Sequence, residues 1–541
     1  MKNLSALLLL AAVATLFNSL LPAPALAQAN CAAESRITHD FDNGARWDFC
    51  WESRIRENLV LSDVHYTPPG EEPVRVLGSA RLSQLHVAYD DTDVTYNDVT
   101  QFGLGGSYMQ TLTQADCPAG QLLEVQTRPT LCLWQTDADD GHRTPSRSAQ
   151  AASIQLFSVS QVGAYAYIVN WTFFDNGSFE PSVGATGALQ RSSNEISEPF
   201  GRVLQGDADT LWLSHTHNYY WRLDFDLGDS AFDDTVYELR YSMDPNGRRL
   251  LDTDVFTTEQ ARRINPGAQQ LWRIMDTSLS NAMGYQLEPT RNGHRFERTD
   301  IEPYTEYDFF VTVGNDCERF ASQNARFNPD CLNHVLQYVD GQSVQNEDII
   351  VWNRVSFHHT PRNEDQRNMH THWDGFLIEP VNLLSGTSAL TDQPNSAPIL
   401  ADLTDKQSAL GALVHEDVAQ ASDADNDLLS FQATGLPPGL RMRLDGHVHG
   451  YPLVEGEYTV NVTARDDFTE TDASFVWMVS ASAGTGTGAG SDTGADTGNP
   501  TGVESGSSAP RRSSGVTGIG FLVCVLLIVG LRHYEYRKTS I

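Results

Sequence analysis

Three histidine pairs in the chain have the spacing of a two-ligand metal site. Successive side chains of a β-strand point to opposite faces, so the two imidazoles of a His-x-His pair share one face. Such a pair suits Cu(II) or Zn(II), although isolated pairs also occur by chance on protein surfaces. The pairs are His215/His217, His370/His372 and His447/His449. The first precedes YYWRLDFD, which alternates like a half-buried strand, whereas the third lies among turn residues and is expected to be solvated. His215/His217 is therefore the preferred candidate.

Alternating carboxylates supply a second type of candidate metal site. Asp224 and Asp226 flank one strand position, and Asp348 lies further along the chain. Oxygen ligands of this kind suit a hard cation such as Ca²⁺, but a solvated acidic strand end has the same pattern. A further acidic stretch, predicted to be a loop that could hold calcium, contains Asp423, Asp425 and Asp427.

These side chains must be positioned mainly by β-strands. Residues 28–395 contain many apolar runs with strand-like alternation, and only 257–283 suggests a helix. The fold class predicted for this region is all-β, with one large and mostly antiparallel domain. The strand-like runs are 58–64, 165–174, 221–227, 308–313 and 348–352.

Residues 396–482 are predicted to form a separate, smaller β-sandwich. They carry the turn signal Gly435-Leu-Pro-Pro-Gly439, followed by alternating runs such as YTVNVT and SFVWMV. The segments ASDADNDLLSFQATGLPPGL and GYPLVEGEYTVNVTARD resemble a cadherin-like, dystroglycan-type Ig module.

Both ends of the chain predict export and membrane anchoring. Residues 1–27 have the charged start, apolar run and A-x-A ending of a signal peptide. Residues 483–515 are a Gly/Thr/Ser-rich stalk, and 516–532 are apolar enough for a C-terminal transmembrane helix. The basic tail, 533–541, then lies in the cytoplasm, and the domains lie in the periplasm or at the cell surface. A removable sorting signal would look similar.

Cysteine usage and net charge agree with an exported protein. Six of the seven cysteines fall in three sequence-near pairs, as in disulfide-bonded secreted proteins. We expect Cys117 to pair with Cys132, and Cys317 with Cys331. The formal net charge of −34 excludes nucleic-acid binding, which needs basic surfaces.

Five segments, in order along the chain, resemble the catalytic domain of copper amine oxidases. Together they extend over about residues 45–385, and in combination they are specific. The segments are RENLVLSDVHY, YNDVTQFGLGG, SVSQVGAYAYIVNWTFFDNGSFEPSVGATGAL, LSHTHNYYWRLDFDLGD and EDIIVWNRVSFHHTPRNEDQRNMHTHWDGFLIEPVNLL.

The resemblance implies a cofactor and a set of site residues. Tyr165 corresponds to the tyrosine that becomes topaquinone, Asp98 to the catalytic base and Tyr89 to the tyrosine that hydrogen-bonds the quinone. A second, calcium-like site corresponds to Asp224, Asp226 and Asp348, with the carbonyls of Phe225 and Ile349. The Cu²⁺ ligands correspond to His215, His217 and His359, since the H-x-P-R-x-E-D frame selects His359 over His358.

The resemblance further implies that a small primary amine reacts with O₂ and water to give an aldehyde, ammonia and H₂O₂, in a homodimer. Two departures lie beside the cofactor position. The family has Asn before the tyrosine and Asp or Glu after it, whereas this chain has Ala164 and Ala166. We therefore expect reduced activity, and the alternative is a catalytically silent surface binding or adhesion protein.

Overall fold

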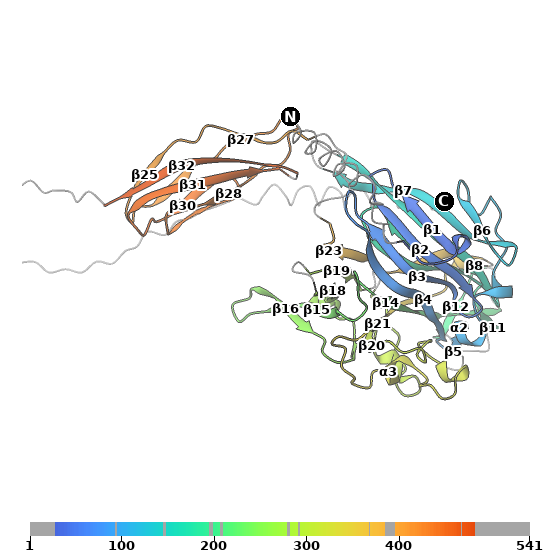
Figure 1. Ribbon diagram of the computed structural model, residues 1–541. Helices are drawn as coiled ribbons and strands as arrows, with labels where there is room; N and C mark the ends of the chain where they lie inside the picture. Colours follow the sequence, from blue (N-terminus) through green and yellow to red (C-terminus); the bar gives the residue numbers. More distant parts are fainter. Residues whose placement is uncertain are drawn as a thin grey trace, which may run out of the picture. The chain divides into compact units, whose positions relative to one another are not determined.

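The computed structural model describes the chain in ten segments and is mainly β-structure (Figure 1). This agrees with the all-β class predicted from the sequence. The described residues are 28–91, 95–143, 148–193, 199–205, 209–278, 282–289, 293–366, 368–384, 395–466 and 468–481. The predicted signal peptide, stalk, transmembrane helix and cytoplasmic tail all lie outside these residues. Within them, no helix is both long and apolar enough to cross a bilayer.

The first large sheet contains nine antiparallel strands in the order β1-β2-β3-β4-β14-β21-β20-β17, with β5 paired to β4. Figure 1 shows β1 to β4 side by side in blue. The strands are β1 (Arg36–Asp40), β2 (Arg46–Arg54), β3 (Asn58–Thr67), β4 (Val74–Tyr89), β5 (Thr95–Asn97), β14 (His215–Phe225), β17 (Gln260–Arg262), β20 (Phe309–Val313) and β21 (Ile349–His359).

The second large sheet contains eleven strands in the order β16-β15-β18-β19-β23-β10-β9-β8-β7-β6, with β22 paired to β10. Between β10 and β14 along the chain, three short strands form a separate small sheet in the order β11-β13-β12. The strands of the large sheet are β6 (Gln121–Val125), β7 (Arg128–Arg143), β8 (Ser148–Val162), β9 (Tyr165–Phe174), β10 (Phe179–Gly187), β15 (Asp234–Met243), β16 (Arg249–Val255), β18 (Leu271–Asp276), β19 (Met283–Leu287), β22 (Met369–Gly375) and β23 (Ile378–Val381). Those of the small sheet are β11 (Arg191–Ser193), β12 (Gly201–Val203) and β13 (Thr210–Leu213).

Aromatic side chains from the two large sheets meet in one hydrophobic core. Phe49 of β2 stacks on Phe173 of β9 with ring centroids 4.7 Å apart, and Trp171 of β9 meets Trp221 of β14 at 5.2 Å. All four side chains are buried. The two sheets therefore form a sandwich, and the inward faces of β9 and β14 look toward each other.

The helix predicted over 257–283 is wrong. This stretch contains β17, a short 3₁₀ turn at Pro266–Ala268 and β18. The Pro266-Gly267 dipeptide interrupts a helix, and β18 hydrogen-bonds along its length between β15 and β19. Sheet pairing therefore decides the conformation of this segment. The described helices are single turns, α2 (Asp98–Gln101) and α3 (Val335–Tyr338).

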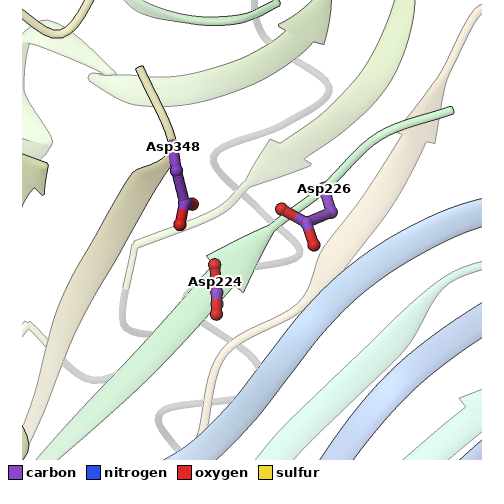
Figure 2. Close-up of side chains that lie close together, drawn as sticks. All are labelled: Asp224, Asp226 and Asp348. Carbon is purple, nitrogen blue, oxygen red and sulfur yellow. The ribbon is translucent and has the colours of Figure 1, made fainter. Parts of the chain in front are cut away.

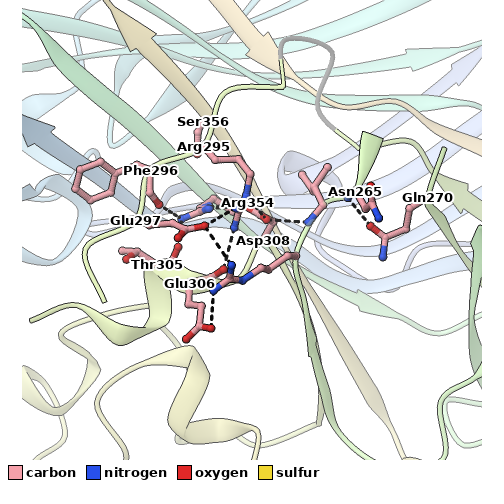
Figure 3. A network of polar contacts seen from close by, with 12 residues as sticks. Asn265, Gln270, Arg295, Phe296, Glu297, Thr305, Glu306, Asp308, Arg354 and Ser356 are labelled. Atoms are coloured by element: carbon pink, nitrogen blue, oxygen red, sulfur yellow. Dashed lines mark hydrogen bonds and ion pairs between the residues drawn. The ribbon is translucent and has the colours of Figure 1, made fainter. Parts of the chain in front are cut away.

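A buried ion-pair network holds the chain before β20 against β21 (Figure 3). Arg354, fully buried in β21, donates from Nε to Asp308 Oδ1 at 3.1 Å and from Nη1 to the carbonyls of Phe296 and Thr305, each at 2.9 Å. Arg295 donates to the other oxygen of Asp308 at 2.7 Å. Removing one member of such a buried pair typically costs about 3–5 kcal/mol. The network therefore fixes β21 five residues before its last histidine.

Residues 395–481 form a second β-structure with its own core around Val448, Val460 and Trp477. Its sheets are β24-β27, β25-β32-β31-β28 and β26-β30-β29, and only β25 and β32 pair in parallel. The strands are β24 (Ile399–Leu400), β25 (Lys406–Ala409), β26 (Val414–Asp417), β27 (Ala421–Ser422), β28 (Ser430–Thr434), β29 (Leu440–Met442), β30 (His447–Gly450), β31 (Gly456–Arg465) and β32 (Glu470–Ser480).

Three disulfides connect the six cysteines among the described residues. Both expected pairs are present, Cys117 with Cys132 and Cys317 with Cys331. The remaining pair is Cys31 with Cys50, which ties the start of the described chain to β2.

Candidate active site

Two neighbouring strands of the first sheet, β14 and β21, bring three predicted histidines together. In the β14–β21 ladder His215 lies directly opposite His359. Their ring centroids are 5.4 Å apart, and those of His215 and His217 are 4.7 Å apart. All three side chains are buried. We call His215, His217 and His359 the imidazole cluster.

The hydrogen bonding of the imidazole cluster leaves nitrogens available to a metal. His359 Nε2 lies 3.0 Å from Asp365 Oδ2, so that nitrogen carries the proton and Nδ1 carries the lone pair. His359 Nδ1 and His217 Nε2 are buried and have no hydrogen-bond partner among the described residues. Unpaired buried polar atoms are costly, and a bound cation would satisfy them.

Burial also favours the protonation state that binds metals. It lowers the pKa of His217 and His359, and it lowers that of His215 to about 3. Neutral imidazole is the form that ligates Cu(II). No three histidine nitrogens among the described residues lie within 4.8 Å of one another. His215 Nε2 lies 3.1 Å from the Tyr165 hydroxyl, so coordination by His215 would replace that hydrogen bond.

His358, the alternative third ligand, points elsewhere. Its Nε2 lies 3.0 Å from Asp90 Oδ2, and its side chain is 40% exposed. Adjacent residues of a strand face opposite sides, so His358 and His359 cannot both join the cluster.

Sequence reasoning did not assign a fourth histidine that lies beside this cluster. The ring of His372 in β22 is 5.3 Å from that of His217 and 5.6 Å from that of His359, between centroids. The available signal was the His370/His372 pair itself. Its partner His370 is exposed on the same strand.

Tyr165 lies between the imidazole cluster and a cavity of about 290 Å³. Its ring centroid is 5.6 Å from those of both His215 and His217, and it stacks on Tyr167 at 5.9 Å. The end of β10 approaches this part of the chain closely, because Gly187, opposite Tyr165 in the β9–β10 ladder, has φ +109 and a Cβ there would meet the Ala164 carbonyl at 2.3 Å. The cavity is lined by Val87, Tyr89, Tyr96, Asp98, Phe102, Val162, Gly163, Ala164, Tyr165, Tyr167 and Gln190.

Asp98 and Tyr89 line the same cavity from the first sheet. Asp98 begins α2 and is 4% exposed. Burial raises the pKa of Asp98 to about 7, although a hydrogen bond from the Tyr167 hydroxyl opposes the rise. Tyr89 sits opposite His215 in the β4–β14 ladder and hydrogen-bonds to Tyr165, and burial raises the pKa of Tyr89. Asp98 can therefore exchange a proton near neutral pH.

The two alanines turn away from this contact. Tyr165 and Tyr167 are buried on one face of β9, whereas Ala164 is exposed and Ala166 half-buried. Ala164 lines the cavity beside Tyr165. Neither alanine offers a polar side chain to the tyrosine ring.

The predicted carboxylate site also assembles, at the other end of the same two strands (Figure 2). One oxygen from each of Asp224, Asp226 and Asp348 lies within 4.8 Å of the others. Each also has one buried oxygen without a hydrogen-bond partner. Phe225 and Ile349 are the buried chain neighbours of these aspartates.

Burial and mutual repulsion raise the pKa values of two of these aspartates. Burial, followed by the charge of Asp224, raises the pKa of Asp226 to about 6 and that of Asp348 to about 7. Two glycines give the aspartates room. A Cβ at Gly78 would lie 2.3 Å from Asp226 Oδ2, and one at Gly314 would lie 2.5 Å from Asp348 Oδ2.

The predicted acidic loop of the smaller β-structure assembles differently. Asp423 and Asp427 come together with Asp466, which follows β31. Asp425 instead accepts the backbone N–H of Ser396 at 2.7 Å. Sequence reasoning missed Asp466, because it is distant along the chain and has no local pattern.

Comparisons with known proteins agree with this arrangement. The family profile described as "Copper amine oxidase, enzyme domain" matches residues 43–398, and the one described as "Putative Ig domain" matches residues 397–480. The chain is 24% identical over 399 residues to a primary amine oxidase of Pisum sativum, covering 64% of this chain and 58% of the relative. It is 25% identical over 413 residues to a primary amine oxidase of Klebsiella aerogenes, covering 66% of this chain and 54% of the relative.

Solved structures share the fold. A copper-containing benzylamine oxidase from Hansenula polymorpha superposes with a TM-score of 0.57 at 18% identity, covering 69% of this chain and 64% of that one. The amine oxidase of Aspergillus nidulans gives a TM-score of 0.55 at 21% identity, covering 64% of this chain and 52% of that one. The chain thus spans less than two thirds of each of these four proteins.

Proposed function

Because the chain belongs to the copper amine oxidase family, we propose that it oxidises small primary amines with O₂. The balanced reaction is amine, O₂ and water to aldehyde, ammonia and H₂O₂. One observation carries the proposal: Tyr165 touches the imidazole cluster and also lines a cavity that contains a buried carboxylate, Asp98. Topaquinone derived from Tyr165 would supply the two-electron chemistry.

The imidazole cluster is the proposed copper site. His215, His217 and His359 offer neutral nitrogens, and Asp365 orients the last ring through its other nitrogen. This carboxylate–histidine arrangement is common behind metal ligands, because it fixes the tautomer and ring orientation. Copper beside Tyr165 would promote oxidation of that ring by O₂.

Asp98 is the proposed base that accepts the proton from the α-carbon of the amine. Its carboxylate must be ionised to do so, and a pKa of about 7 leaves a useful fraction ionised at neutral pH. The hydrogen bond from Tyr167 stabilises this ionised form. Tyr89, which hydrogen-bonds to Tyr165, would hold the oxygen of the ring in place.

The cavity lining favours small amines with an apolar substituent. Val87, Tyr96, Phe102 and Val162 contribute apolar or aromatic surface, and among the described lining residues Asp98 alone carries a carboxylate. A cavity of about 290 Å³ holds a short alkyl or benzyl group.

Asp224, Asp226 and Asp348 form the proposed peripheral calcium site, with the carbonyls of Phe225 and Ile349 completing it. Hard oxygen ligands and three carboxylates suit Ca²⁺. The cation would offset the burial and the mutual repulsion that raise the pKa of Asp226 and of Asp348, so its role would be structural. Asp423, Asp427 and Asp466 form a second proposed calcium site in the Ig-like module.

A silent binding protein is the second candidate, favoured by Ala164 and Ala166. Without polar side chains at these two positions, the Tyr165 ring has fewer restraints on its orientation than the family pattern provides, and turnover requires one orientation. We propose reduced turnover rather than none, since the imidazole cluster, Tyr165 and Asp98 are all in place.

The proposed setting is outside the cytoplasm. Three disulfides support an oxidising compartment. The signal peptide at 1–27 and the membrane helix at 516–532 would deliver and anchor the chain, and the family analogy suggests a homodimer.

The test is O₂ consumption and H₂O₂ release by copper-loaded protein supplied with methylamine and with benzylamine. Amine-dependent, equimolar O₂ uptake and H₂O₂ release that disappears in Tyr165→Phe would support the proposal. Wild-type protein that binds copper but consumes no O₂ with any primary amine would overturn it and favour the silent binding protein.

A further inference from the structure

A fourth histidine closes the imidazole cluster from the opposite sheet. His372 lies in β22, which pairs with β10 and places His372 across from Ala185. Its ring is nearly perpendicular to those of His217 and His359, at 87° and 83°. His372 therefore belongs to the second sheet and lies beside an imidazole cluster whose three histidines belong to the first.

The hydrogen bonding of His372 directs a lone pair into the protein. Its Nδ1 lies 2.8 Å from Asp374 Oδ2. Because a carboxylate accepts this bond, Nδ1 carries the proton and Nε2 carries the lone pair. Nε2 is buried and has no hydrogen-bond partner among the described residues. His372 Nε2 is therefore a third buried nitrogen without a hydrogen-bond partner among the described residues, beside His217 Nε2 and His359 Nδ1 of the imidazole cluster.

His359 has the same arrangement of a carboxylate at one ring nitrogen and a buried, unpartnered second nitrogen. There Asp365 holds one ring nitrogen and leaves the other buried and unpartnered. A carboxylate behind a metal-bound imidazole fixes its orientation and increases its basicity. His372 and Asp374 reproduce this pairing, with the roles of the two nitrogens exchanged.

Packing holds the His372 ring in this position. It stacks on Phe357 with centroids 4.2 Å apart and an interplanar angle of 25°. Turning the ring away would break both this contact and the bond to Asp374. The side chain is 15% exposed, so solvent reaches only its edge.

We propose that His372 is a fourth imidazole ligand of the copper centre, bound through Nε2. The inference rests on the proposed function, because it assumes that copper occupies the imidazole cluster. Four nitrogen donors suit the tetragonal preference of Cu(II). The fourth ring takes a coordination position that solvent would otherwise fill, so the metal binds more tightly and with fewer water ligands.

The experiment compares copper-loaded wild type with His372→Gln and with the matched control His370→Gln. His370 lies two residues earlier on the same strand and is exposed. Copper content, copper affinity by chelator competition, and the low-temperature EPR spectrum with its nitrogen splittings are measured on each full-length protein.

We expect four nitrogens in wild type and in the control. His372→Gln should retain one copper with a changed spectrum and three nitrogens. Its affinity should fall by at least about tenfold, the lower limit for loss of even an outer-shell partner. Asp374→Asn should keep the fourth nitrogen and bind copper more weakly than wild type. Similar unfolding midpoints of the metal-free proteins would separate these effects from a general loss of structure.

A wild-type spectrum with three nitrogens, or identical spectra and affinities for wild type and His372→Gln, would overturn the assignment. Wild type that binds no copper would overturn both this inference and the proposed function. Copper held by four nitrogens without quinone formation would contradict the oxidase proposal and leave the role of His372 intact.

Discussion

The same two strands carry two different candidate metal sites at their opposite ends. β14 begins with His215 and ends beside Asp224, while β21 begins after Asp348 and ends with His359. The strands are antiparallel, so imidazoles gather at one end and carboxylates at the other. Nine residues separate His215 from Asp224, which is about 30 Å at roughly 3.4 Å per residue.

Burial acts on the two sites in the same way and with opposite chemical results. It disfavours charge at both, so it lowers histidine pKa values at one end and raises aspartate pKa values at the other. Neutral imidazole is ready to bind a borderline metal, whereas crowded carboxylates need a hard cation to remain ionised together. One strand pair would thus keep the proposed copper centre apart from the proposed calcium site.

The largest expected effect comes from removing a histidine at the imidazole end. His359→Ala should weaken copper binding by more than about 100-fold, since outer-shell changes alone cost about 10- to 100-fold. It should also leave no detectable quinone or oxidase activity. Copper analysis and quinone staining measure both, with His358→Ala as the matched control. Equal copper loss in the two variants would contradict the ligand assignment. Calcium binding should not change in either.

Replacing the proposed base should slow turnover while leaving the cofactor in place. Asp98→Asn should lower kcat by about 10²- to 10⁴-fold with normal copper and quinone content. In wild type, the ionised carboxylate is the active form and its pKa is about 7. Activity should therefore rise as pH increases through about 7 and be lost below it. A kcat profile without this rise in wild type, or with an unchanged rise in the variant, would argue against Asp98.

At the carboxylate end, we expect changes in stability without changes in chemistry. Adding Ca²⁺ to metal-free protein should raise the unfolding midpoint by roughly 2–5 °C, because a ligand stabilises the state that binds it. Asp348→Asn should abolish that shift in calorimetry and leave the copper EPR spectrum unchanged. An altered copper spectrum would show that the two ends are coupled.

The smallest expected effect comes from restoring a polar neighbour to Tyr165. Ala164→Asn adds a side chain that can hydrogen-bond at the cavity wall. One hydrogen bond is worth about 0.5–1.5 kcal/mol, so kcat should increase by about two- to tenfold. Steady-state kinetics with benzylamine measure this, and Ala164→Ser is a smaller polar control. No gain in either variant would contradict the expectation that Ala164 lowers turnover.

Local sequence patterns predicted the five strand-like runs, the His215/His217 pair and the alternating Asp224 and Asp226. The run 165–174 is β9, 58–64 lies within β3, and most of 221–227 lies within β14. Their aromatic and β-branched residues are typical of strands, although much of each strand is buried on both faces. The resemblance supplied His359, Tyr165 and Asp98 as further site residues, and the structure places His359 opposite His215 and places Asp98 with Tyr165 in the lining of one cavity.

Long-range pairing explains what the sequence did not predict. The helix expected over 257–283 failed because β15 and β19 hold β18 as a strand. His372 belonged to a recognised pair, but its approach to His217 depends on β22 joining β10 in the other sheet. Asp466 lacks any local pattern and joins Asp423 only through the course of β31.

The central claim is that Tyr165 is converted to topaquinone beside the imidazole cluster. Full-length protein loaded with copper in air is digested with trypsin, and the peptide 148–191 is sequenced by mass spectrometry. The account predicts a gain of two oxygen atoms and a loss of two hydrogens on Tyr165, with Tyr167 unchanged. An unmodified Tyr165 in protein that holds copper would contradict the oxidase account and favour a silent binding protein.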